Sequence, residues 1–176
     1  MLTGERVRLR QLTQDDAEAH WRWNHDDEVM RWFSTAFPIP LAKFTEGYAE
    51  RRVMSYENAA FGIETLADER LIGLVMLGDT SHENGDAELD IYIGEKDCWG
   101  RGYGTDALRL MCRFGFDRMG LRRIHLWVAD ENLGAIGAYK KVGFVEEGRA
   151  RKTFRSKGVW HDMVLMGLLE DELIES

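Results

Sequence analysis

The chain has 176 residues, of which 44% are hydrophobic and 31% are charged, a composition typical of a folded globular domain and not of a disordered chain. Its 23 Lys and Arg against 31 Asp and Glu give a net charge of −8, which argues against a protein that coats nucleic acid, because phosphate binding requires a basic field. No apolar run approaches the roughly 20 residues that cross a bilayer, and the start of the chain has no apolar core of a signal peptide. We therefore expect one cytoplasmic domain over residues 1–176, with no membrane partner.

The first half of the chain predicts short strands and helices in mixed order. Residues 5–12 alternate between apolar and basic side chains, which predicts a half-buried strand. Thr13 is a suitable N-cap, so a helix is expected from there to about Trp23. Further along, we expect a short helical stretch at 26–33, a break at Phe37–Pro40, a helix from Leu41 to about Glu57, and a hairpin of two strands at 59–66 and 70–79.

The second half has the order strand, turn, helix, strand, helix and final hairpin. In the strand predicted at 87–93, Glu88, Asp90 and Tyr92 share one face. The other elements are expected at about 105–119 (helix), 122–129 (strand), 132–141 (helix), 143–154 and 159–169 (hairpin). The whole predicts an α/β (α+β) domain with a mixed sheet of about seven strands flanked by about four helices.

A glycine-rich turn, Trp99-Gly100-Arg101-Gly102-Tyr103-Gly104-Thr105, separates the strand at 87–93 from the helix that follows. Glycines let backbone N–H groups converge on an anion, and the amino end of the next helix adds its dipole. The spacing matches neither a Walker loop nor the Gly-x-Gly-x-x-Gly of dinucleotide-binding folds. A phosphate-binding loop and a plain tight turn are both compatible with the glycines alone.

Two segments resemble signatures of the GNAT acyltransferases. Residues 99–104 resemble the acetyl-CoA-binding motif Gln/Arg-x-x-Gly-x-Gly/Ala, with Trp99 where the family usually has Gln or Arg. Residues 132–144, which begin with Asn132 and include Tyr139, resemble the motif Asn-x-x-Ala-x-x-x-Tyr-x-x-x-Gly-Phe. The resemblance implies the GNAT fold and an N-acetyltransferase that uses acetyl-CoA as co-substrate.

The resemblance also implies roles for individual residues. Tyr139 would protonate the departing thiolate, since a Tyr hydroxyl stays protonated at neutral pH. The strand before the glycine turn would pair its backbone with the pantetheine arm, and the loop amides would hold the pyrophosphate. The implied acetyl-CoA-binding residues are Ile91, Tyr92, Ile93, Trp99, Gly100, Arg101, Gly102, Tyr103, Gly104, Thr105 and Asn132. From the residues alone, a helix N-cap is the favoured interpretation of Asn132 and a core position that of Tyr139.

An amine acceptor must lose its proton before it can attack a thioester, so a general base is needed. Glu88 and Asp90 are the candidates, because many GNAT enzymes place a carboxylate on the strand before the glycine loop. Both are also compatible with solvent-facing strand positions. Neither Cys98 nor Cys112 has a His at metal-ligand spacing, and the five His form no spaced pair, so the sequence predicts no metal site.

The N-terminal pattern, including Asn24 and residues 29–33, resembles the bacterial spermidine acetyltransferases and the ribosomal-protein N-terminal acetyltransferases. The polyamine enzymes carry acids where this chain has Ser34-Thr35-Ala36, although the acidic run 26–28 lies nearby. We expect the acceptor to be a primary amine, either of a polyamine-like small molecule or of a protein N-terminus. A non-catalytic acyl-CoA-binding module and a nucleotide-phosphate binder are the alternatives. Exposed strand edges and six Trp are compatible with a homodimer.

Overall fold

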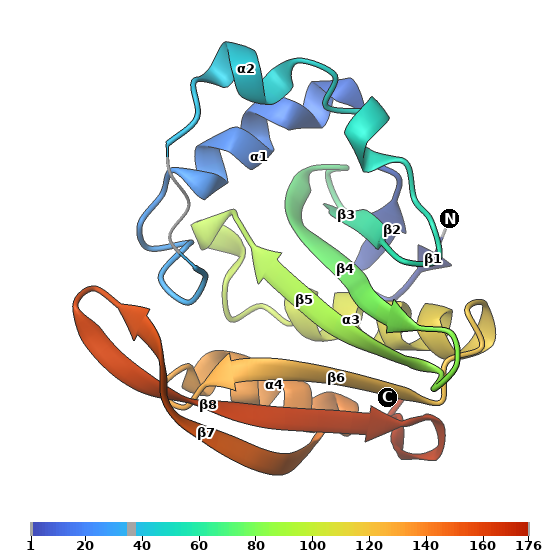
Figure 1. The fold of residues 1–176 in the computed structure, drawn as a ribbon. Helices are drawn as coiled ribbons and strands as arrows, with labels where there is room; N and C mark the ends of the chain where they lie inside the picture. Colours follow the sequence, from blue (N-terminus) through green and yellow to red (C-terminus); the bar gives the residue numbers. More distant parts are fainter. Residues whose placement is uncertain (1, 35–37, 176) are drawn as a thin grey trace.

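The computed structural model describes residues 2–34 and 38–175, and these form one eight-stranded sheet with four α-helices (Figure 1). The strands are β1 (Leu2–Thr3), β2 (Val7–Arg10), β3 (Ala59–Thr65), β4 (Leu71–Ser81), β5 (Asp86–Ile93), β6 (Arg123–Ala129), β7 (Val145–Ser156) and β8 (Val159–Leu169). The helices are α1 (Ala17–Asn24), α2 (Leu41–Thr45), α3 (Tyr103–Asp117) and α4 (Leu133–Val142).

The strands follow the order β1-β2-β3-β4-β5-β6-β8-β7 across the sheet. Neighbours are antiparallel except for β5 and β6, which are parallel. A parallel pair needs a crossover connection, and α3 supplies it. The mixed sheet agrees with the fold class expected from the sequence, and the additional strand is the two-residue β1.

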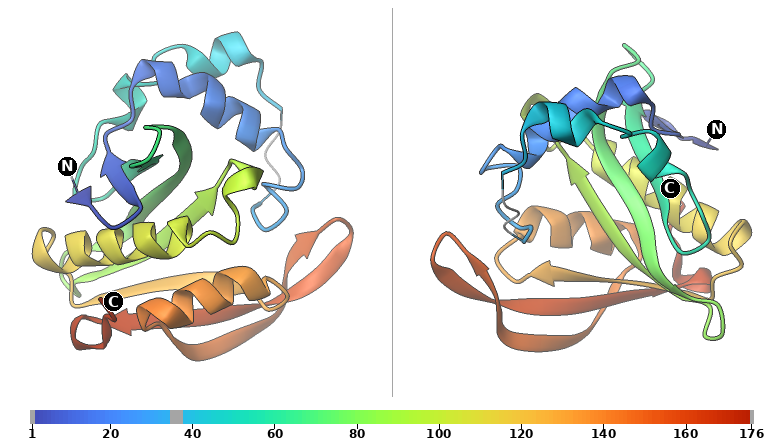
Figure 2. Two further views of the ribbon diagram at one scale, coloured as in Figure 1. Left: turned by 180° about the vertical axis from the view of Figure 1, so that it is seen from behind. Right: turned by 45° about the horizontal axis from the view of Figure 1, so that its top comes forward.

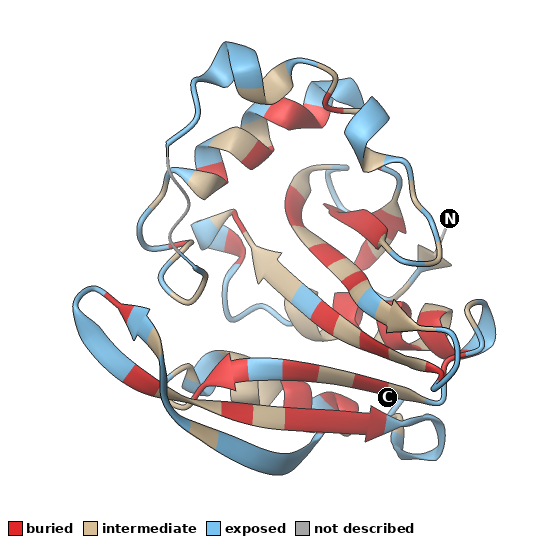
Figure 3. Cartoon of the chain, viewed as in Figure 1, coloured by how far each residue is buried: buried red, intermediate tan, exposed pale blue. Residues whose placement is uncertain are grey.

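Two helices, α3 and α4, cover the same face of the sheet (Figure 2, left). The apolar stripe of α3, which includes Ala107, Leu108 and Met111, is buried in the main core. Burial alternates along β6, as Figure 3 shows, so that Ile124 and Leu126 enter this core. The other face of β5 receives α1, whose Trp23 packs against Tyr92 with ring centroids 6.0 Å apart.

The elements of the second half lie close to their predicted positions, and the hairpin of β3 and β4 does too. The strand expected at 5–12 is shorter, at Val7–Arg10. The helix expected from Thr13 begins with a 3₁₀ turn, Gln14–Asp16, and continues as α1. In that turn the Thr13 N–H donates a hydrogen bond to Asp16 at 2.7 Å.

Two helix predictions in the first half are wrong. Residues 26–33 form successive turns. The Asp26 carboxylate caps the first turn by accepting the N–H groups of Glu28 and Val29. The N–H groups of Arg31 and Phe33 then bond to carbonyls three residues back, so the segment continues as tight turns and not as a regular α-helix. The helix from Leu41 ends at Thr45 and not near Glu57, because Gly47 follows with a φ of 59°. The break expected at 37–40 falls partly on residue 37, outside the described residues. No helix of the described part of the chain is long and apolar enough to cross a membrane.

Candidate active site

The parallel strands β5 and β6 separate soon after they meet. They pair only from Asp86 to Glu88 on β5, opposite Arg123 to His125 on β6. Beyond this point β5 stays paired with β4 as far as Ile93, while β5 and β6 diverge toward the left in Figure 1. The β6-facing backbone of β5 from Leu89 to Ile93 therefore has no strand partner among the described residues. Such free peptide groups can pair with an extended amide-containing ligand.

The glycine-rich loop follows directly from the free end of β5. Trp99 anchors it by donating its indole N–H to the carbonyl of Ile93 at 2.8 Å. Gly100 and Gly102 have φ values of 71° and 84°, a region that glycine adopts without strain. Gly102 is the N-cap of α3, so the first N–H groups of that helix have no intrahelical partner. Together these features place free amides and the positive end of a helix dipole at the loop, an arrangement that favours an anion.

A basic side chain from the opposite end of the sequence lies beside this loop. A Cβ on Gly102 would lie 3.5 Å from Nε of Arg6, which shows how closely the guanidinium approaches. Asp106, in the first turns of α3, positions it by accepting the backbone N–H groups of Glu5, Arg6 and Val7 at 3.3, 2.7 and 3.0 Å. Arg6 was not predicted from the sequence, because its position depends on contacts across about 100 residues of chain.

The two candidate bases lie on the face of β5 opposite α3. Glu88 is half-buried and Asp90 is exposed, yet surrounding protein still disfavours both charged forms. Desolvation raises the pKa of Glu88, and the charge of Asp90 raises it further. The pKa of Asp90 is likewise raised by desolvation and then by Asp79, which has a φ of 45° at the irregular end of β4. Asp79 was not singled out from the sequence, since nothing in the strand pattern places it beside β5.

Tyr139 lies on α4 and Asn132 is the N-cap of that helix, which flanks the opening between β5 and β6. The Asn132 side chain accepts the N–H of Ala135 at 3.4 Å, so the N-cap interpretation is confirmed for its oxygen. Tyr139 is 7% exposed and packs against Phe144. Burial raises the pKa of Tyr139 well above its ordinary value, and the charge of Asp90 raises it further. The phenol therefore stays protonated at neutral pH and can act as a donor.

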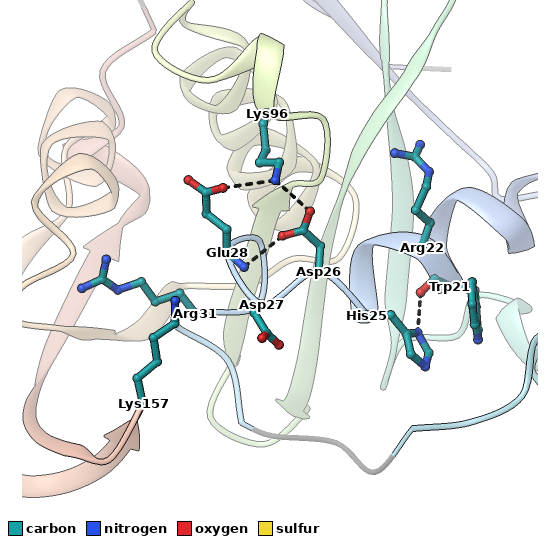
Figure 4. Close-up of a pocket in the computed structure, with 9 residues that line it drawn as sticks. All are labelled: Trp21, Arg22, His25, Asp26, Asp27, Glu28, Arg31, Lys96 and Lys157. Carbon is teal, nitrogen blue, oxygen red and sulfur yellow. Dashed lines mark hydrogen bonds and ion pairs between the residues drawn. The ribbon is translucent and has the colours of Figure 1, made fainter.

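The acidic run at 26–28 lines an open pocket of about 720 Å³ (Figure 4). In this pocket Lys96 binds Asp26 at 2.9 Å and Glu28 at 3.1 Å, while Asp27 points away from it. The lining residues are Trp21, Arg22, His25, Asp26, Asp27, Glu28, Arg31, Lys96 and Lys157. Acids and bases are thus mixed there, and none of the candidate catalytic residues is among them. Residues 35 and 36, part of the segment where the polyamine enzymes carry acids, lie outside the described residues.

Comparison with known proteins gives a consistent picture. The sequence model of one protein family, the acetyltransferase (GNAT) domain, matches residues 6–145. A probable N-acetyltransferase, YjcK of Bacillus subtilis, is 31% identical over 98% of each chain. The spermidine N(1)-acetyltransferase of Escherichia coli is 27% identical over 99% of this chain and 91% of its own. The crystal structure of spermidine N-acetyltransferase from Vibrio cholerae in complex with CoA and spermine is 26% identical, with a TM-score of 0.83 over 94% of this chain and 96% of the other.

Proposed function

Because the chain belongs to the GNAT acetyltransferase family and is an acetyl-CoA-dependent N-acetyltransferase, we propose that it acetylates a primary amine and that Glu88, Asp90 and Tyr139 carry the proton transfers. We further propose that the chain works as one domain, which its single continuous sheet supports. Nothing supports a non-catalytic acyl-CoA-binding module.

The observation that carries this proposal is the pair of carboxylates with raised pKa beside the divergence of β5 and β6. A base is most effective when its pKa lies near the working pH, and the environment moves Glu88 and Asp90 in that direction. Acetyl-CoA supplies an activated thioester. In the proposed roles one carboxylate accepts the proton of the ammonium group, directly or through water, and Tyr139 donates a proton to the departing thiolate.

The cofactor-binding roles are proposed for the residues around the loop. The backbone of Ile91 to Ile93 would pair with the pantetheine arm, since no strand pairs with that edge. The amides between Gly100 and Thr105 would hold the pyrophosphate, aided by the charges of Arg101 and Arg6. Asn132 would contact the cofactor arm through its amide N–H₂, since its oxygen caps α4.

Each acceptor class is favoured by a different feature. Desolvation raises the pKa of both Glu88 and Asp90, and the charges of Asp90 and Asp79 respectively raise them further, which favours a cationic, polyamine-like acceptor. The mixed charges of the pocket in Figure 4 favour a protein N-terminus, because Lys96 already neutralises Asp26 and Glu28. A peptide can present side chains of both signs to such a surface.

The decisive experiment is thiol release from acetyl-CoA by the purified protein, with spermidine, spermine and unblocked peptides as acceptors. N-terminally acetylated versions of the same peptides serve as matched controls. We expect release with one class only. An α-amine has a pKa of about 8 and an alkylamine one above 10, so the rate with peptides should reach its plateau at lower pH. Binding of acetyl-CoA without thiol release from any amine would contradict the proposal.

A further inference from the structure

Three metal-ligating side chains from two distant segments converge at the end of β6. Asp130 and Glu131 follow the last residue of β6 and precede α4, while His161 lies on β8. One ligand atom from each lies within 4.8 Å of the others. Sequence spacing could not predict the group, because residues 132–160, with the whole of α4 and β7, separate its two segments.

The imidazole of His161 is held in a way that hydrogen bonding does not explain. The residue is 5% exposed, and its buried Nδ1 has no hydrogen-bond partner among the described residues. Buried polar atoms are nearly always satisfied, so each exception requires an explanation. The closest carboxylate oxygen, Oε1 of Glu131, lies 3.5 Å from Nδ1. This exceeds the usual N–H···O distance of about 2.9 Å.

The same distance fits two ligands of one metal ion. Zinc binds imidazole nitrogen and carboxylate oxygen at about 2.0–2.2 Å, and tetrahedral geometry places two such atoms about 3.4 Å apart. We propose that Asp130, Glu131 and His161 bind one divalent transition-metal ion of the zinc class. Imidazole as a ligand disfavours calcium and magnesium, which prefer oxygen. Glu131 is largely exposed, so solvent can supply the fourth ligand.

The surroundings of the site restrain its ligands. Arg149 contacts one oxygen of Asp130 and one of Asp162, each at 3.1 Å, which leaves the second oxygen of Asp130 for a metal. The ring of Trp32 packs edge-on against His161 with centroids 5.3 Å apart, so the imidazole has little freedom to turn. Such outer contacts commonly orient metal ligands. The ion would tie β8 to the junction of β6 and α4, and it has no part in the acyl transfer proposed above.

Cobalt(II) is the appropriate probe, because its visible absorption reports tetrahedral coordination. Titration of the purified full-length protein should reveal one cobalt per chain, displaced by zinc. Zinc should also raise the melting temperature, since it binds the folded state. Both Glu131→Gln and His161→Asn should weaken metal binding by more than about tenfold, given that even outer-shell changes cost 10–100-fold. Because Glu131 is at the surface, the Glu131→Gln variant should fold normally. It therefore tests the proposal even if His161→Asn, at a buried position, fails to fold.

The matched control is His82→Asn. His82 lies 3.8 Å from Glu57 and is exposed, so it forms a surface His–carboxylate pair without a third ligand. This variant should keep the cobalt spectrum and the zinc-induced rise in melting temperature. Absence of stoichiometric cobalt binding would overturn the proposal. Binding that persists in Glu131→Gln, or that is lost in His82→Asn, would overturn it as well.

Discussion

The two ends of β5 have opposite electrostatic environments. Near its amino end, Glu88 and Asp90 share one face with Asp79 close by. Desolvation, and then the charge of a neighbouring acid, raises the pKa of Glu88 and of Asp90. At its carboxyl end, the glycine loop turns the free N–H groups of α3 outward, with Arg6 against Gly102. One strand thus separates a region that attracts cations from a region that attracts anions. The overall charge of −8 describes neither of them.

The difference shows how a two-substrate site can be assembled on one strand. Like charges held together raise the free energy of the folded protein unless a counter-charge arrives, and an ammonium group supplies it. The loop is the converse case, because helix amides and arginine are stabilised by a phosphate. Breaking either end should therefore affect one substrate and spare the other.

Removal of both carboxylates, in the variant Glu88→Gln with Asp90→Asn, should have the largest effect. A positioned base contributes about 10²–10⁴-fold, so kcat/KM for the amine should fall by at least 10²-fold while acetyl-CoA binding is retained. Because their pKa values are raised, Glu88 and Asp90 stay protonated, and so cannot act as bases, up to a higher pH than ordinary carboxyl groups. Wild-type activity should therefore rise with pH as these carboxyl groups lose their protons. The double variant should lack this rising part of the pH–rate profile.

Steady-state kinetics against pH, together with calorimetric titration of acetyl-CoA, provide the measurement. Glu83→Gln is the control, because Glu83 is an exposed acid in the loop before β5. An unchanged rate in the double variant would rule out both residues as the base.

The substitution Tyr139→Phe should have a smaller effect, confined to turnover. Burial and the charge of Asp90 keep the phenol protonated, so its loss removes a proton donor and nothing else in the packing. We expect kcat to fall by about 10–100-fold with little change in the dissociation constant of acetyl-CoA. Stopped-flow thiol release and binding titration measure the two quantities separately. Tyr56→Phe is the control, because this half-buried ring stacks on His82, away from the candidate catalytic residues. Equal turnover of the Tyr139 variant and wild type would exclude the acid role.

The sequence predicted the conformation of the glycine loop and the start of α4 better than that of the segment between residues 26 and 57. Gly100 and Gly102 adopt positive φ, and Asn132 caps α4. At these positions the local preferences of glycine and asparagine agree with the conformation in the folded protein. Between residues 26 and 57 helical propensity was overridden, first by the tight-turn hydrogen bonds of Arg31 and Phe33 to carbonyls three residues back and then by the positive φ of Gly47. Such competition depends on details that periodicity does not contain.

The same limit applies to the site residues. Glu88 and Asp90 were predictable, because strand alternation puts them on one face. Asp79, Arg6 and the convergence of His161 with Glu131 were not, because each depends on which strands and loops become neighbours. The groups proposed for catalysis lie within a few elements of recognisable motifs, whereas Arg6 and the pair of His161 with Glu131 are brought into place by segments remote in the sequence.

The smallest expected effect is that of Arg6→Gln at the anion-binding end of β5. Arg6 is exposed and its charge is screened by salt, so KM for acetyl-CoA should rise by only about 3–10-fold, with kcat unchanged. The control is Arg118→Gln, which removes an exposed arginine from the other end of α3. A long-range effect of net charge would appear equally in both variants, whereas a local contact with the phosphates appears only at Arg6. The difference should also shrink as ionic strength rises. If KM is the same for both variants at low salt, the loop amides and Arg101 hold the phosphates without Arg6.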